Sequence, residues 1–345
     1  MPELRIDPIL GRRVYIAEDR AGRPNDYVGQ FFRNSRNAAS PCVPPQPLHP
    51  TPRPGVSEKL PYVQACPFCA GNEVHTPVAT TTVLDANGQW QVRVVPNKYP
   101  AVTLDEAEIA AFGLHEVIIE TPAHVLNVTD LGVEHLATIL TVFRDRLRHW
   151  ANDRRLKHAV VFKNSGFDAG ASLEHVHSQL VALPYVPAAV QAELDAVARF
   201  HGSHGRCLFC DLVQRETAAG DRVVIRNHGY LAVCAEAPRQ PYETWILPER
   251  HAARFDALDD DQLHAQARVL HELLRRLQAA SPGAAYNLLL HTGPFHALEA
   301  AFHWHWELVP RLTHEAGLEW GSGVFITPLS PEHAAATLRA TLKSQ

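Results

Sequence analysis

The feature that most constrains the fold is an internal repeat, because the 345-residue chain presents the same series of motifs twice. Each copy opens with two cysteines separated by two residues, at residues 66–69 and again at residues 207–210. Each copy closes with a His-x-His motif, at residues 175–177 and at residues 303–305. This repetition predicts two structurally similar units rather than two unrelated domains.

Strand-like segments follow in the same order in both copies. Residues 90–95 and 221–225 are rich in β-branched residues and favour strands. Residues 115–124 align without a gap with residues 242–251, and both segments end in a histidine. The matched histidines suggest that the two units share the geometry of a site as well as a fold.

One amphipathic helix is predicted in each copy, followed by one more strand at residues 160–166 and 287–293. The apolar residues at helical spacing are Leu136, Ile139, Leu140, Phe143, Leu147 and Trp150 in the first copy, and Leu263, Ala267, Leu270, Leu274 and Leu277 in the second. A single helix per unit beside several strands predicts an α+β fold in which antiparallel sheets are covered by helices. We assign residues 1–195 to an N-terminal domain, with a proline-rich surface loop at 32–64, and residues 196–345 to a C-terminal domain.

Composition excludes several classes of partner. A formal net charge of −5, with no run of Lys and Arg, argues against binding to nucleic acid. No segment approaches the roughly 20 apolar residues that span a membrane, and the polar start of the chain lacks the apolar stretch of a secretion signal. The sequence therefore predicts a soluble, cytoplasmic protein without membrane partners.

Two cysteines and two histidines in the first copy have the ligand types and number of a closed zinc site. The predicted ligands are Cys66, Cys69, His124 and His175. Buried thiols beside ordinary histidines are the alternative, and a redox-active cysteine pair is another. The recurrence of the same pattern in the second copy favours metal.

The second copy predicts a second zinc ion, which would make two per chain. The predicted ligands are Cys207, Cys210, His251 and His303. Other histidines that could replace a ligand are His201, His204, His291 and His305.

His177 is the candidate nucleophile. On extended backbone, side chains two residues apart point the same way, so His177 lies beside the predicted metal ligand His175. A neutral imidazole fixed by a rigid neighbour can attack an α-phosphorus and form a phosphoramidate that a second phosphate cleaves. Gln179, two residues further on the same face, can donate to the phosphoryl oxygens.

Short polar and glycine positions before this motif are candidates for a phosphate cradle. They are Asn164, Ser165, Gly166 and Ser172. The second copy carries Glu307 where the first has Gln179, and a carboxylate would repel a phosphoryl group. We therefore expect catalysis in the first copy and a structural role for the second.

Together these motifs resemble the galactose-1-phosphate uridylyltransferase family, the transferase branch of the histidine-triad superfamily. The resemblance is carried by residues 66–69, 96–100, 170–179 and 303–305 and spans nearly the whole chain. It implies a duplicated histidine-triad unit, a homodimer and a ping-pong mechanism in which His177 becomes nucleotidylated. It also implies the following site residues: Asn164, Ser172 and Gln179 at the phosphate, Asn97 near the nucleoside, and Arg20 and Arg23 at the substrate.

The resemblance leaves two enzyme hypotheses. The first is uridylyl transfer from the nucleotide sugar UDP-glucose to the sugar 1-phosphate galactose 1-phosphate. The second is adenylyl transfer from ADP-glucose to phosphate, because Cys207 and Cys210 resemble the two-zinc branch that includes ADP-glucose phosphorylase. Residues 321–324 also lack the Tyr-Glu of the hexose contacts. A histidine-triad hydrolase, which would carry histidine at position 179, and a zinc-binding module without activity are more distant alternatives.

Overall fold

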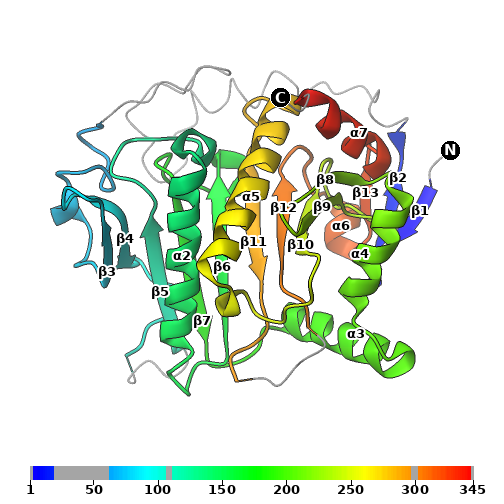
Figure 1. The fold of residues 1–345 in the computed structure, drawn as a ribbon, viewed down its shortest axis with the longest axis horizontal. Helices are drawn as coiled ribbons and strands as arrows, with labels where there is room; N and C mark the ends of the chain where they lie inside the picture. Colours follow the sequence, from blue (N-terminus) through cyan, green and yellow to red (C-terminus); the bar gives the residue numbers. More distant parts are fainter. Residues whose placement is uncertain (1–2, 19–61, 106–110, 297–301, 343–345) are drawn as a thin grey trace.

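The computed structural model describes residues 3–18, 62–105, 111–296 and 302–342 (Figure 1). Within these residues a sheet of ten antiparallel strands forms the centre of the molecule. From one edge, the first copy supplies β3 (Thr81–Leu84), β4 (Trp90–Pro96), β5 (Leu114–Ile119), β7 (His177–Leu183) and β6 (His158–Ser165). The second copy continues the sheet with β11 (Tyr286–His291), β12 (His305–Pro310), β10 (Thr244–Pro248), β9 (Tyr230–Cys234) and β8 (Val223–Asn227).

The two copies meet along the seam between β6 and β11. These equivalent strands run antiparallel, and Asn164 on β6 pairs with Asn287 on β11. Counted outward from the seam, each copy presents its strands in the same order, so an approximate twofold axis relates the copies. The α+β fold and the duplication predicted from the sequence are confirmed, with both units sharing one sheet.

Two helices cover one face of this sheet and pack side by side, α2 (Val133–Trp150) and α5 (Asp260–Ala280) (Figure 1). They are the two predicted amphipathic helices, and the predicted apolar positions are buried apart from the half-buried Trp150. Asp259 and Gln262 form a reciprocal capping box that begins α5. The helices close the main hydrophobic core against one face of the sheet.

Within the described residues, the remaining elements are four helices, a small three-stranded sheet and four 3₁₀ helices. They are α3 (Ala188–His204), α4 (Leu208–Ala219), α6 (Gly317–Ser322), α7 (Pro331–Thr341), a small sheet of β1 (Glu3–Ile6), β2 (Arg13–Ile16) and β13 (Phe325–Thr327), and the 3₁₀ helices η2 (Glu73–His75), η4 (Val128–Leu131), η5 (Phe167–Ala169) and η6 (Phe255–Ala257). The predicted boundary between residues 195 and 196 falls inside α3, and the division into two domains stays a prediction. Most of the predicted 32–64 loop lies outside the described residues.

The ungapped alignment of residues 115–124 with residues 242–251 is wrong by one residue over the strands β5 and β10. Ile118 on β5 pairs with Ser178 on β7, whereas Ile246 on β10 pairs with Trp306 on β12. The first copy therefore has one extra residue just after β5, which we assign to Glu120. The shift cannot be seen in the sequence, because the segments have equal length and both end in histidine.

No helix in the described part of the chain is long and apolar enough to cross a membrane.

Candidate active site

The predicted ligands of the first metal site converge. Cys66, Cys69, His124 and His175 place one ligand atom each within 4.8 Å of the others, and all four are buried. The Sγ–Nδ1 distances are 3.6 Å for Cys66–His175, 3.4 Å for Cys69–His124 and 3.7 Å for Cys69–His175. Zinc bonds of about 2.3 Å to sulfur and 2.1 Å to nitrogen give tetrahedral edges of roughly 3.6 Å. The donor set therefore fits a tetrahedral metal.

A backbone carbonyl fixes the tautomer of His175. Its Nε2 lies 2.9 Å from the carbonyl oxygen of Thr121, which can only accept, so Nε2 carries the proton. The Nδ1 lone pair is then directed at the cysteine sulfurs. Burial lowers the pKa of His175 to about 4, which keeps the imidazole in the neutral form that binds metals.

The second set of predicted ligands has the same arrangement. Ligand atoms of Cys207, Cys210, His251 and His303 also lie within 4.8 Å of one another, although His251 is exposed. The Nε2 of His303 lies 3.0 Å from a backbone carbonyl oxygen, that of Pro248. Both predicted metal clusters are therefore built on one plan, with the same histidine tautomer.

The other histidines near the second site do not join it. His201 and His204 are exposed on α3. His291 and His305 instead form a separate group with Glu193, whose ligand atoms also lie within 4.8 Å of one another.

His177, at the start of β7, is the nucleophile candidate and is buried. Its Nδ1 lies 2.8 Å from the carbonyl oxygen of the metal-ligand candidate His175, so Nδ1 carries the proton and Nε2 keeps the lone pair. Burial lowers the pKa of His177, which favours the neutral imidazole that a nucleophile needs. Phe68, between Cys66 and Cys69, packs edge-on against the rings of His175 and His177.

A buried ion pair supports the strand behind His177, and sequence reasoning missed it. Lys163 Nζ donates to Glu120 over 2.7 Å and to the carbonyl oxygen of His177 over 3.0 Å. The hydroxyl of Ser178 donates to the same carboxylate over 2.6 Å. The second copy has the apolar Leu290 in place of the lysine and a tryptophan in place of the serine. This polar support therefore belongs to the first copy alone.

Gln179 is held by a histidine that sequence reasoning also left without a role. The Oε1 of Gln179 lies 2.8 Å from Nε2 of His115 on the neighbouring strand β5. The same Nε2 lies 3.0 Å from Nδ2 of Asn97, which follows β4. His115 therefore lies between the residue predicted near the nucleoside and the one predicted at the phosphate, and its Nε2 donates to Gln179 because Nδ1 accepts from the amide of Ala101. The contact depends on the register in which Val117 on β5 pairs with Gln179 on β7, and the sequence carries no signal for that register.

The predicted phosphate cradle is assembled only in part. Asn164 is half-buried and faces away from the two covering helices. The next residue on β6, Ser165, points to the opposite face and contacts the buried Tyr286, so its hydroxyl lies away from Asn164. Ser172 is exposed on the loop before His175. Arg20 and Arg23 lie outside the described residues.

Glycine is required at position 166. Its φ is +85°, and a Cβ there would lie 2.8 Å from the Cβ of Ala285 in the second copy. In the loop that follows, the amides of Ala169, Gly170 and Ala171 donate to carbonyl oxygens of the loop itself. Those three amides are therefore engaged, and the side chains must supply most of the donors to a phosphate.

In the second copy, charged side chains that pair with one another occupy the position that corresponds to this site. His305, the equivalent of His177, has its Nε2 3.7 Å from a carboxylate oxygen of Glu193 on α3. His291 bridges Glu193 and Glu307 at 3.1 and 3.3 Å, and Arg239 pairs with the other oxygen of Glu307. The nearby carboxylates of Glu193 and Glu307 would repel an incoming phosphoryl group at His305. The predicted asymmetry between the copies thus has a structural basis.

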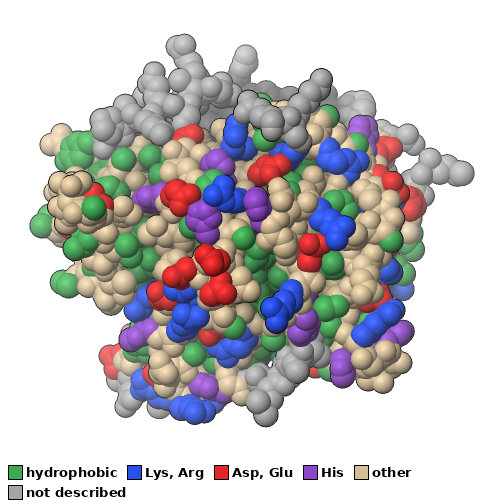
Figure 2. Space-filling view, viewed as in Figure 1, with side chains coloured by type: hydrophobic (Ala, Val, Ile, Leu, Met, Phe, Trp, Pro, Cys, Tyr) green, Lys and Arg blue, Asp and Glu red, His purple; other side chains and the backbone are tan. Residues whose placement is uncertain are grey.

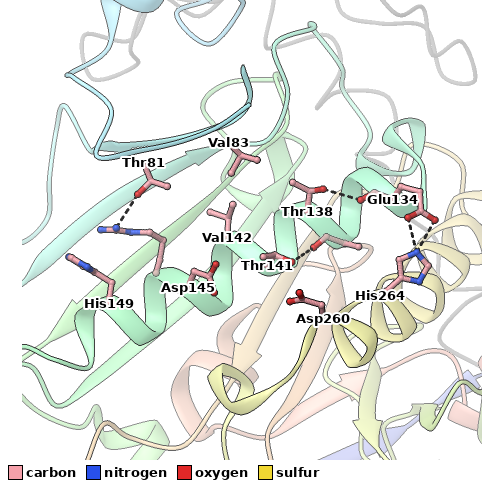
Figure 3. A pocket seen from close by; sticks show the side chains of 12 residues that line it. Thr81, Val83, Glu134, Thr138, Thr141, Val142, Asp145, His149, Asp260 and His264 are labelled. Carbon is pink, nitrogen blue, oxygen red and sulfur yellow. Dashed lines mark hydrogen bonds and ion pairs between the residues drawn. The ribbon is translucent and has the colours of Figure 1, made fainter. Parts of the chain in front are cut away.

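A hollow on the helix-covered face is a separate feature. Histidine and acidic side chains gather over α2 and α5 on this face (Figure 2). The hollow lies between α2, β3 and the start of α5, where Glu134 and His264 point toward each other at 2.8 Å (Figure 3). His177 does not line it, because Ser178 and not His177 points to the helix-covered face.

Comparisons with known proteins show the family of the chain. Residues 193–319 match the model of the galactose-1-phosphate uridyl transferase C-terminal domain, and residues 57–186 match the N-terminal domain of DUF4931, a family of unknown function. ADP-glucose phosphorylase of Arabidopsis thaliana is 30% identical, over 98% of this chain and 92% of that protein. Galactose-1-phosphate uridylyltransferase of Thermotoga maritima is 24% identical, over 80% of this chain and 89% of that protein.

Solved structures extend the likeness to the fold. The Arabidopsis thaliana ADP-glucose phosphorylase with bound ADP-glucose superposes with a TM-score of 0.83 at 29% identity, covering 99% of this chain and all of that one (100%). A uridylyltransferase structure gives a TM-score of 0.73 at 29% identity, with coverage of 99% and 100%. With a full-length relative at 30% identity and a match to the uridyl transferase C-terminal domain, the chain belongs to the galactose-1-phosphate uridylyltransferase family of nucleotidyltransferases.

Proposed function

We propose that this nucleotidyltransferase carries an adenylyl group from ADP-glucose to phosphate through a covalent bond to His177. The observation that carries the proposal is the fixed tautomer of His177, whose Nδ1 is engaged by the carbonyl oxygen of His175 while Nε2 keeps its lone pair. An imidazole held in this way is ready to attack phosphorus without first losing a proton.

The two half-reactions balance. In the first, the Nε2 lone pair of His177 attacks the α-phosphorus, a P–N bond forms, and the P–O bond to the β-phosphate breaks. Glucose 1-phosphate leaves with that electron pair. In the second, an oxygen of inorganic phosphate attacks the same phosphorus, the P–N bond breaks, and its electron pair returns to Nε2. Gln179 and Asn164 would donate to the phosphoryl oxygens as charge develops on them.

The sequence motifs favour uridylyl transfer to galactose 1-phosphate, whereas the comparisons favour the alternative, adenylyl transfer from ADP-glucose to phosphate. The full-length relative at 30% identity is named as an ADP-glucose phosphorylase. The complete second cluster around Cys207 and Cys210 also supports that branch. Uridylyl transfer stays the second candidate, because the Thermotoga maritima relative carries that name.

We propose that both cysteine–histidine clusters hold Zn²⁺, two ions per chain. Each is a closed set of four protein ligands, which is typical of structural zinc that stabilises the fold. His175 would connect the first ion to catalysis, because its backbone carbonyl orients His177. The substrate contacts that we propose are Asn97, Asn164, Gly166, Ser172, Gln179, Arg20 and Arg23. A homodimer and a cytoplasmic location stay predictions from the sequence.

Competing donors and acceptors test the proposal. The protein is incubated with ADP-glucose or UDP-glucose alone, and intact mass spectrometry then measures any nucleotide that stays bound. The labelled protein is next given phosphate or galactose 1-phosphate, and the released nucleotide is identified. Labelling by ADP-glucose and release of ADP by phosphate support the phosphorylase. Labelling by UDP-glucose with release of UDP-galactose would transfer the assignment to the uridylyltransferase, and no labelling by either would reject both.

A further inference from the structure

The second copy supplies a residue to the catalytic site. We propose that Asn287, on β11 of the second copy, is a positioning residue that turns the amide of Asn164 so that its NH₂ group faces the phosphoryl group. The inference rests on the proposed function, since it assigns Asn164 a phosphate to bind. It gives the second copy a part in catalysis beyond the structural role expected from the sequence.

Hydrogen-bond polarity fixes the orientation of both amides. The backbone carbonyl of Ala169 can only accept, so the Asn287 atom 2.9 Å from it must be the donor Nδ2. The same Nδ2 lies 2.9 Å from Asn164, so the Asn164 atom that it meets must be the acceptor Oδ1. The Nδ2 of Asn164 then faces the loop at Gly170. A Cβ added at Gly170 would lie 3.9 Å from this nitrogen.

The strand register places these residues in a row across the sheet. Asn287 on β11 pairs with Asn164 on β6 across the seam. Phe162 pairs with Gln179 on the other side of β6, and continuing that antiparallel register by two residues sets Asn164 beside His177. Cross-strand neighbours point to the same face. The Asn164 amide therefore lies between its orienting residue and the nucleophile.

The first copy does not supply an equivalent orienting residue to the second copy across the seam. The twofold-equivalent of Asn287 is Val160 in the first copy, which has no polar side-chain atom. The equivalent of Asn164 is His291, and it is held by Glu193 and Glu307 instead. The Asn287–Asn164 contact is thus specific to the catalytic side, where a donor must be directed at a phosphate.

A double-mutant cycle tests the inference. The single-turnover rate of nucleotidyl-His177 formation from ADP-glucose is measured for Asn287→Ala, Asn287→Asp, Asn164→Ala and both combined variants. Asn287→Asp should slow the step more than Asn287→Ala, because a carboxylate only accepts and would turn the oxygen of Asn164 toward the phosphate. We expect losses approaching the roughly 10²-fold effect of removing one such donor. With Asn164→Ala present, neither change should slow the step further.

Controls separate positioning from general damage. Asn152→Ala, at an exposed asparagine after α2, should leave the rate unchanged. Melting temperature and metal content are measured for every variant, and a positioning role predicts that the rate falls while the metal content does not. If Asn287→Ala and Asn287→Asp label like the wild type, or slow the Asn164→Ala protein by the same factor, the inference is wrong while the proposed function stands. Failure of the wild type to label would reject the proposed function itself.

Discussion

The Nδ1 of His177 donates a 2.8 Å hydrogen bond to the backbone carbonyl oxygen of His175. His175 contributes its own Nδ1 to a cluster with Cys66 and Cys69. A metal at that cluster would therefore fix the backbone that sets the tautomer of the nucleophile. The proposed metal and the proposed nucleophile are therefore linked through one residue, His175.

That link predicts different consequences for the two metal sites. Cys66→Ser should remove one metal ion, lower the melting temperature and abolish labelling of His177, because structural zinc contributes to folding free energy and its loss releases His175. Cys207→Ser should also remove one ion and lower the melting temperature but leave labelling largely intact. Elemental analysis and intact mass measure both effects. Full labelling by a Cys66→Ser protein that has lost its metal would contradict the link.

The buried ion pair behind the nucleophile should be costly to break. The side chains of Lys163 and Glu120 are only 4% and 1% exposed. Lys163→Met leaves the buried Glu120 carboxylate without its charged partner, and such changes cost about 3–5 kcal/mol. The double variant Glu120→Gln with Lys163→Met should recover part of the loss. Urea unfolding measures both, and equal stability of Lys163→Met and wild type would show that the pair contributes nothing.

Gln179 separates transfer from hydrolysis. Gln179→Glu introduces the residue found at the equivalent position of the second copy, Glu307, and its carboxylate should repel the phosphoryl oxygens and slow nucleotidylation by on the order of 10²–10³-fold. Gln179→His should instead raise the rate at which water discharges the intermediate. Single-turnover formation and decay, with and without phosphate, test both changes. Wild-type rates in both variants would make Gln179 a bystander.

The charge cluster of the second copy predicts a pH effect on stability. Burial opposes the charge on His291, but its ion pairs with Glu193 and Glu307 outweigh burial and raise its pKa to about 10. Because that value lies above the unfolded one of about 6.5, the contribution to the free energy of unfolding is full below about pH 6.5 and is lost as pH rises toward 10. His291→Gln should narrow the difference in stability between pH 7 and pH 9.5, measured by urea unfolding. If the stability of His291→Gln differs between pH 7 and pH 9.5 by as much as that of the wild type, His291 is not the source of the pH effect.

The sequence predicted what depends on local pattern. Helical spacing located α2 and α5, and the repeated cysteine and histidine motifs located both cysteine–histidine clusters. It could not predict contacts between strands that are distant in the chain. His115, Lys163 and Asn287 act through strand neighbours, and a period of two residues identifies the face of a strand but neither its neighbour nor its register. The offset at Glu120 escaped detection for the same reason.

The most direct test of the account is the mass of the protein after incubation with ADP-glucose in the absence of phosphate. The wild type should gain the mass of one adenylyl group and lose it, as ADP, when phosphate is added. His177→Ala should gain nothing while it keeps its metal content and melting temperature, because it lacks only the attachment atom. An adenylylated His177→Ala protein, or a wild type that turns over without ever holding the nucleotide, would contradict the covalent mechanism.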